Sequence, residues 1–203
     1  MFLKMISIIS VSVAYIAAQI LADISSLKIV MFAGLSMDAG TFIYPITFTL
    51  RDMIHKVAGI KAARVLVALA AVVNVFMAVY FAFVSSLPGD PQVGDQSGFA
   101  EVLSPIWRLV VASIVAEVVS ELIDTEAYRI WTTKITTNYQ WARVLVSNSF
   151  SIPIDSVLFA WIAFSGSMPK AVIWGIVWSN ILVKGITTLI GMPLIYTVKE
   201  KSA

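Results

Sequence analysis

Apolar runs of membrane-spanning length recur along this chain and constrain its fold more than any other feature. A transmembrane helix needs about 20 predominantly apolar residues, and lipid offers no hydrogen bonds to an open backbone. Of the 203 residues, 59% are hydrophobic and 13% are charged, about half the charged fraction of a typical soluble domain. The sequence therefore predicts an all-α integral membrane protein with six transmembrane helices. We place them at about residues 5–23, 39–53, 62–84, 105–128, 144–164 and 171–198.

The composition also narrows the classes of function. The sequence contains no cysteine, which excludes a disulfide framework and a cysteine-ligated metal site. A net charge of +2, dispersed along the chain, does not favour nucleic acid as a partner. The first run, with Lys4 before it, is long enough to be retained as a helix rather than cleaved as a signal peptide. We expect one multi-pass transmembrane domain, residues 1–203, in the cell inner (plasma) membrane.

The charges between the runs predict the orientation. Basic residues gather at 51–64, at 129–143 and near both ends, where Lys4, Lys199 and Lys201 lie. With six helices these positions all fall on one side of the membrane. The connection at 85–104 contains only acidic charges and falls on the other side. Because cytoplasmic loops carry an excess of Lys and Arg, we expect both termini to be cytoplasmic.

An acidic stripe interrupts the fourth run. Glu117, Glu121 and Asp124 are spaced i, i+4 and i+7, which places them on one face of a helix. Each charge facing lipid near the bilayer centre would cost about 2.5–3.5 kcal/mol. The stripe is therefore expected to face protein, a cavity or water, and it predicts a functional site.

Two further ionisable residues lie near the middle of apolar runs. Asp155 is in the fifth run and Lys184 is in the sixth, where Asn180 shares its stripe. Buried charges are expected to pair, and Lys184 can pair with one carboxylate of Asp155 or Glu117. Three interpretations remain open: a binding site for a ligand rich in N–H donors, a proton relay, and polar contacts that only hold helices together.

No pattern supports catalysis or a bound metal. His55, the single histidine, lies in a basic connection, and the sequence has no metal-ligand, nucleophile or phosphate-loop motif. We therefore expect no enzyme activity, no cofactor and no metal. A separate feature is a row of small residues in the first run, Ala14, Ala18 and Ala22. It suits close helix packing, either internal or against a second copy or a partner subunit.

Four motifs together resemble those of the queuosine precursor transporters, also called the vitamin uptake transporter family. The first is the segment 39–52, AGTFIYPITFTLRD, which is similar to the family's "AG…FPITF…D" signature. The others are Arg108…Ala112-Ser113…Ser120-Glu121…Asp124, Ser151…Asp155…Phe159…Ala163-Phe164, and Lys184…Pro193. The resemblance runs from about Gln19 to the last run. Glu121 stands where the family often has Gln, and Glu117 is not a motif residue.

The resemblance implies import of a 7-deazaguanine, such as 7-cyano-7-deazaguanine, for making queuosine in tRNA. On this hypothesis Glu121, Asp155 and Glu117 accept hydrogen bonds from the base edge, and Lys184 and Asn180 serve its carbonyl side. Tyr44, Phe48 and Trp178 are candidates for stacking on the planar base. Asp52, Arg108 and Asp124 are expected to organise the helices or to gate the site.

Two other classes of function remain alternatives. The chain could be the substrate-binding membrane subunit of an ATP-driven vitamin or nucleobase uptake system, with the alanine row docking the partner. It could also be a membrane scaffold that transports nothing. The expected partners are the small-molecule substrate and the lipid bilayer, with a homodimer left open.

Overall fold

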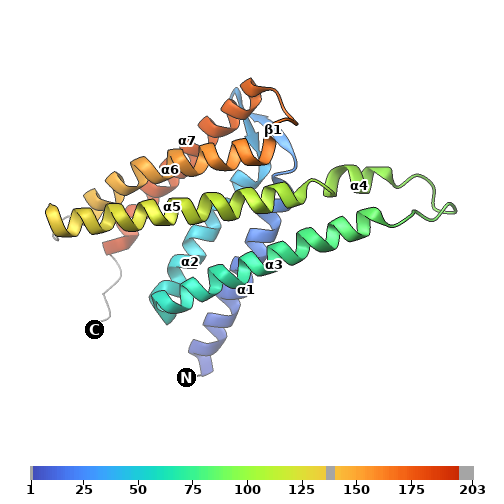
Figure 1. Cartoon of the computed structure of the whole chain (residues 1–203). Coiled ribbons are helices and arrows are strands. Elements are labelled where there is room, and N and C mark those ends of the chain that lie inside the picture. Colours follow the sequence, from blue (N-terminus) through green and yellow to red (C-terminus); the bar gives the residue numbers. More distant parts are fainter. Residues whose placement is uncertain (1, 136–139, 197–203) are drawn as a thin grey trace. The chain divides into compact units, whose positions relative to one another are not determined.

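The computed structural model describes residues 2–135 and 140–196, apart from some side chains within the helices (Figure 1). The described part is mostly helical, with one short hairpin. Its α-helices are α1 (Phe2–Ser25), α2 (Tyr44–Ala58), α3 (Ile60–Ser86), α4 (Ser97–Leu103), α5 (Ile106–Lys134), α6 (Gln140–Phe164) and α7 (Lys170–Tyr196). The remaining elements are the strands β1 (Ile29–Phe32) and β2 (Leu35–Asp38) and the 3₁₀ helix η1 (Ala39–Phe42).

Five helical segments within the described residues are long and apolar enough to cross a membrane. They are Ile8–Ser25, Lys61–Ser86, Ser97–Ser120, Leu145–Phe164 and Lys170–Ile190. The predicted second span is not among them, because α2 has 15 residues and so measures only about 22 Å against a hydrocarbon core of about 30 Å. The multi-pass membrane character is thus supported, whereas six spans and cytoplasmic termini stay predictions.

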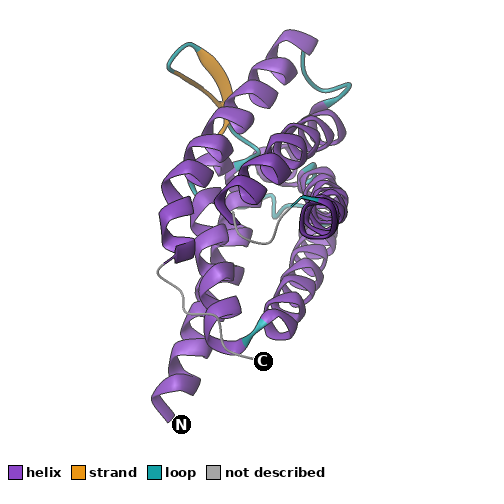
Figure 2. Cartoon of the chain, turned by 90° about the vertical axis from the view of Figure 1, so that its left-hand side faces the viewer, coloured by secondary structure: helices purple, strands orange, loops and turns teal. Residues whose placement is uncertain are grey.

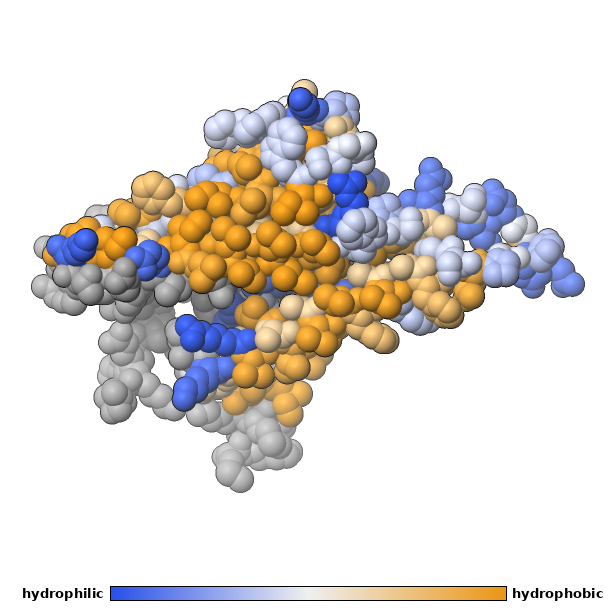
Figure 3. Space-filling view, viewed as in Figure 1, coloured by the Kyte–Doolittle hydropathy of each residue, from blue (hydrophilic) through white to orange (hydrophobic). Residues whose placement is uncertain are grey.

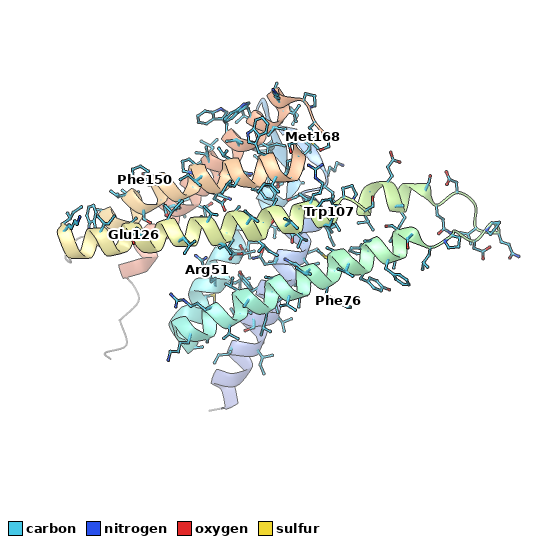
Figure 4. All side chains as sticks on the ribbon, viewed as in Figure 1. Arg51, Phe76, Trp107, Glu126, Phe150 and Met168 are labelled. Atoms are coloured by element: carbon cyan, nitrogen blue, oxygen red, sulfur yellow. The ribbon has the colours of Figure 1, made fainter. Side chains whose placement is uncertain are left out.

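The surface of α3 suits lipid. Hydrophobic side chains cover this helix in the space-filling view, and hydrophilic ones gather on the 87–96 connection beyond its end (Figure 3). Phe76 lies on the outer side of α3 (Figure 4) with 69% of its surface exposed. Exposed apolar side chains over a helix of this length are expected where acyl chains, rather than water, surround it.

The chain divides into two compact units. The first comprises Met1–Met31 and Met37–Val111, and the second comprises Phe32–Ser36 and Ala112–Ala203. The boundary thus falls twice within the β1–β2 hairpin and once within α5. That the chain works as one transporter domain stays a prediction.

The first unit has its core where α1, α2 and α3 pack together. Tyr15, Ile54 and Leu66 are buried in one cluster with Ala63 and Ala70. The chain reverses between α2 and α3 at Gly59, whose φ of 93° is a conformation that glycine adopts without steric cost. Ala63 and Ala70, two small residues of α3, thus pack in the same cluster as residues of α1 and α2.

The short helix α4 follows the acidic connection in the first unit. Phe99 of α4 packs edge-on against Phe81 of α3, with ring centroids 6.4 Å apart. Asp95 accepts hydrogen bonds from the amide and the hydroxyl of Ser97, at 2.9 and 3.0 Å. These two bonds hold the pKa of the exposed Asp95 carboxyl below its ordinary value, because they favour the charged form.

The hairpin, η1 and the short helix α4 are elements that the sequence did not predict. A short connection is expected at about 25–34, but β1 and β2 form a two-stranded hairpin over 29–38. Its turn consists of Ala33 and Gly34, with φ of 48° and 82°. Two successive residues with positive φ are typical of the tight turns whose twist matches that of paired strands. The fold is therefore mostly α rather than strictly all-α.

Asp38 ends the hairpin and begins η1. Its carboxylate accepts three hydrogen bonds: from the Ser26 hydroxyl at 2.8 Å, the Thr41 amide at 3.2 Å and the Thr41 hydroxyl at 3.0 Å. Asp38 is only 2% exposed. The end of α1 thus holds the start of η1 at a fixed place, in the first unit.

Gly40 allows this close approach of η1 to α1. A Cβ atom at this position would lie 2.1 Å from the Ser26 Oγ and 2.4 Å from the carbonyl oxygen of Ala22. Gly40→Ala is therefore expected to lower the free energy of unfolding by about 1–3 kcal/mol, as overpacking does. Thermal unfolding of the purified protein in detergent measures this loss.

Gly98→Ala is the matched control in the same unit. A Cβ at Gly98, within α4, would meet no atom within 4 Å, and alanine is the better helix former. This variant is expected to unfold at the wild-type temperature or slightly above it. Equal stability of the two variants would contradict the packing described for Gly40.

Candidate functional site

Helices α6 and α7 form an antiparallel pair in the second unit. A short turn at Ser165–Gly166–Ser167 joins them, with Gly166 at φ 77°. Near this turn their contact is apolar, and small residues of α6, Ala160 and Ala163, are buried. Further from the turn the buried residues of both helices are polar, and this part is the candidate site.

The buried face of α6 is polar along this second part. Ser147, Ser151 and Asp155 follow each other at four-residue intervals, and all three are buried. Phe150 instead lies on the outer side of α6 (Figure 4), with 60% of its surface exposed. In soluble proteins the buried face of a helix is apolar and the exposed face is polar, and here the two are exchanged. In a helix surrounded by lipid, a polar buried face is one that meets protein or a cavity.

Asp155 and Lys184 form an ion pair between α6 and α7. Each side chain retains only 11% of its exposure. From the sequence we expected Lys184 to pair with the carboxylate of either Asp155 or Glu117. The structure shows an ion pair of Lys184 with Asp155. The pair lowers the cost of holding both charges in the membrane, because each compensates the other.

Further polar groups flank the ion pair. Asn148 donates a hydrogen bond to the Thr188 hydroxyl at 3.3 Å, about one turn further along α7. Asn180, one turn before Lys184, is 3% exposed. Pro153 lies inside α6, so the carbonyl of Ser149 receives no intrahelical N–H at that point. The α6–α7 contact thus offers hydrogen-bond donors and acceptors on both sides of the pair.

The structure does not bring every predicted site residue to this pair. Trp178 is 58% exposed, whereas its neighbours Val177 and Ser179 are buried, so it lies on the outward face of α7. Glu117 and Arg108 are partly buried on α5, and Tyr44 begins α2 in the first unit. The side chains of Phe48, Asp52, Glu121 and Asp124 lie outside the described part of the structure.

A second buried polar cluster was missed by the sequence analysis. It lies in the first unit and comprises Asp38, Ser26 and Thr41, joined by hydrogen bonds, with the buried Asp23 one helical turn before Ser26 on α1. The detectable signal is an Asp three residues before a Thr at the start of a helical segment, a spacing typical of N-caps. The partner Ser26 gives no such signal.

The ion pair offers hydrogen-bonding groups of both kinds to a ligand. A carboxylate can accept two parallel N–H bonds, and an ammonium can donate to a carbonyl. Among the described residues, no group of three or more His, Cys, Asp or Glu could hold a metal ion. The α6–α7 contact therefore offers an acceptor and a donor to a polar ligand.

The comparison with protein families identifies the family of this chain. The family described as "Putative vitamin uptake transporter" matches residues 38–198. The chain belongs to this family. The match begins at the η1 cap, Asp38, and includes both Asp155 and Lys184. The resemblance inferred from the four motifs is thus confirmed, and with it a transport role in the membrane.

A curated relative agrees with this vitamin uptake transporter assignment. The "Probable queuosine precursor transporter" of Bacillus subtilis (strain 168) is 25% identical over 189 residues, covering 90% of this chain and 80% of the relative. No solved structure matches the chain significantly.

The ion pair predicts a non-additive pattern of stability. Asp155→Asn leaves the Lys184 ammonium without its carboxylate, and Lys184→Met leaves the carboxylate uncompensated. Because breaking a buried pair is costly, each single variant is expected to lose about 3 kcal/mol. Thermal unfolding in detergent measures both losses.

The double variant, with Asp155→Asn and Lys184→Met together, is the comparison that isolates the pair. Since it leaves no unpaired charge, its loss of stability is expected to be well below the sum of the two single losses. Strict additivity would show that the two charges do not stabilise each other.

Proposed function

We propose that this protein is a secondary transporter that imports a queuosine precursor, a 7-deazaguanine such as 7-cyano-7-deazaguanine, across the inner (plasma) membrane. Membership of the vitamin uptake transporter family supports transport, and the name of the Bacillus subtilis relative supports the substrate. The observation that carries the proposal is the ion pair of Asp155 and Lys184 inside an apolar helix pair.

The donor pattern of the base suits this pair. The edge of a guanine-like base presents a ring N–H beside an exocyclic NH₂, and a carbonyl follows. Asp155 accepts the two N–H bonds, and Lys184 or Asn180 donates to the carbonyl. When the base binds, each charged group replaces its hydrogen bond to the other charged group by hydrogen bonds to the base. The carboxylate and the ammonium therefore keep hydrogen-bond partners while the substrate is held.

Other residues complete the proposed site. Glu121 and Glu117 provide further acceptors, and Tyr44 and Phe48 provide aromatic surfaces for the base. Arg108, Asp52 and Asp124 organise the helices or gate the passage. Trp178 is the weakest member, because its side chain lies on the outward face of α7.

The proposed topology keeps six crossings with both termini in the cytoplasm. The second crossing is then the broken segment from η1 through α2, 20 residues from Ala39 to Ala58. At about 2.0 Å per residue in η1 and 1.5 Å in α2, its length approaches the 30 Å of the core. Interrupted helices of this kind often contribute to substrate sites in transporters.

Asp155 provides the direct functional test. Asp155→Asn keeps the size of the side chain but replaces one acceptor oxygen by a donor, so it cannot accept both N–H bonds of the base. Uptake of labelled 7-cyano-7-deazaguanine by cells is expected to fall at least 100-fold, with the protein still present in the membrane by immunoblot. Wild-type uptake by this variant would remove Asp155 from the site.

A charge exchange separates binding from folding. The double variant with Asp155→Lys and Lys184→Asp keeps an ion pair between α6 and α7 but reverses which helix offers the acceptor. Its stability is expected to exceed that of either single exchange, while uptake stays lost because the base edge meets its donors and acceptors in the wrong order. Recovery of uptake would show that the pair serves helix packing alone.

The substrate and the mode of transport are tested with the purified protein. A 7-deazaguanine at 100 times its Kd is expected to stabilise the protein by about 2.7 kcal/mol, with guanine and unrelated vitamins weaker. Uptake into liposomes by this chain alone supports a secondary transporter, whereas a requirement for an ATP-hydrolysing partner supports the alternative. Of the alanine row proposed for docking such a partner, Ala18 and Ala22 are buried within the first unit and Ala14 is exposed.

A further inference from the structure

Ser156 has a buried hydroxyl that takes no part in the contacts described above. The residue directly follows Asp155 on α6 and is 0% exposed. Its hydroxyl oxygen has no hydrogen-bond partner among the described residues. A buried polar group without a partner lowers the stability of the folded protein, and such groups are uncommon in native structures. This hydroxyl is therefore a candidate for a contact that forms only when a ligand is present.

Other hydroxyls of the same two helices are satisfied by their own backbone. Ser149 on α6 and Thr187 on α7 each donate to the carbonyl four residues earlier, at 2.7 Å. Figure 2 shows the described part of the chain as helix apart from one hairpin and the connecting loops. A serine inside a helix commonly bonds to the carbonyl three or four residues earlier. Ser156 lies inside α6 and makes no such bond.

Ser179, a fully buried serine of α7, contrasts with Ser156. Its hydroxyl lies 3.1 Å from the carbonyl of Ser36 and 2.9 Å from that of Ile176. The backbone of β2 comes this close because residue 175 is a glycine. A Cβ atom on Gly175 would lie 3.0 Å from the Ser36 Cβ. The Ser179 hydroxyl is thus satisfied by the packing of β2 on α7, whereas the Ser156 hydroxyl has no equivalent acceptor.

The register of the helix pair places Ser156 on one particular side of the ion pair. Because α6 and α7 are antiparallel, a step along α6 toward their connecting turn is a step back along α7. Asp155 meets Lys184. The next residue, Ser156, thus lies on the side of the pair toward Asn180. Its side chain points about 100° around α6 from that of Asp155, so the two side chains can contact different atoms of one ligand.

The carbonyl of the base supplies the acceptor that this hydroxyl lacks. A carbonyl oxygen has two lone pairs and can accept two hydrogen bonds. In the proposed function Lys184 or Asn180 donates one of them, and both residues lie on the same side as Ser156. A second donation from the Ser156 hydroxyl would satisfy the other lone pair and remove the cost of the buried unpartnered group.

We propose that Ser156 is a further substrate-binding residue, whose hydroxyl donates to the carbonyl of the base in the bound state. This inference rests on the proposed function and identifies a residue that distinguishes bases by their carbonyl. One substitution at Ser156 therefore has opposite effects on stability and on binding. A serine that only holds helices together would lower both or neither.

Stability without ligand is the first test. Ser156→Ala removes the unpartnered hydroxyl, so its unfolding temperature in detergent is expected to rise by about 2–4 °C. Ser149→Ala is the matched control for helix propensity on α6. It removes a hydroxyl that is already bonded, so its unfolding temperature is expected to stay at or below that of the wild type. An unchanged or lower value for Ser156→Ala would show that the hydroxyl is satisfied in the free protein and would overturn the proposal.

Binding to the purified protein is the second test. Ser156→Ala is expected to bind 7-cyano-7-deazaguanine about fivefold more weakly, because one hydrogen bond is lost. Ser156→Cys nearly keeps the volume of the side chain but is a weak donor, so it is expected to lose affinity as well. Ser167→Ala, at the turn between α6 and α7, removes a hydroxyl bonded to the Phe164 carbonyl and is expected to bind as the wild type does.

A change in the ligand identifies the atom that Ser156 contacts. An analogue with a thiocarbonyl in place of the carbonyl keeps the N–H donors of the base but is a weaker acceptor. The ratio of the two dissociation constants, analogue to parent base, is expected to be about fivefold smaller in Ser156→Ala than in the wild type. Equal ratios would show that Ser156 does not contact the carbonyl.

Failure of this inference differs from failure of the proposed function. If the wild type binds no deazaguanine, the proposed function fails and the role of Ser156 fails with it. If the wild type binds the base and Ser156→Ala binds it equally well, the proposed function stands and the role of Ser156 alone is overturned.

Discussion

The compensation of Asp155 by Lys184 is the interaction on which the membrane-embedded part of the second unit depends. A single unpaired charge near the middle of a transmembrane helix costs about 2.5–3.5 kcal/mol, a large fraction of the stability of a small domain. The two charges lie on facing sides of α6 and α7, so the helices must keep this register.

The first unit uses a different device at the start of η1. The buried Asp38 carboxylate accepts hydrogen bonds from two hydroxyls and an amide. Gly40 lets the chain approach α1 closely enough for these bonds to form. As a result, η1 starts from a defined point even though α2 is too short to cross a membrane alone. The same anchor holds the end of β2.

Particular residues show how far the sequence could predict this structure. Asp155 and Lys184 were found because a charge in an apolar run is conspicuous, and a charge in lipid needs a partner. The pairing of Lys184 with Asp155 could not be read from spacing, since Glu117 is a second carboxylate at similar depth in its run. Trp178 was a reasonable stacking candidate by composition, but the rotation of α7 turns it outward. Ser36, Gly175 and Ser179 were missed because each is an ordinary small residue until the fold brings the three together.

The sequence by itself determined the class of protein. Hydrophobic runs, four motifs and midplane charges lead to a multi-pass member of the vitamin uptake transporter family, because the bilayer imposes length and polarity on every segment that enters it. Only the tertiary structure decided which buried groups meet: Lys184 with Asp155, Ser26 with Asp38, and Ser179 with Ser36. Such pairs depend on helix rotation and on backbone approach at Gly40 and Gly175, and neither leaves a periodic signal in the chain.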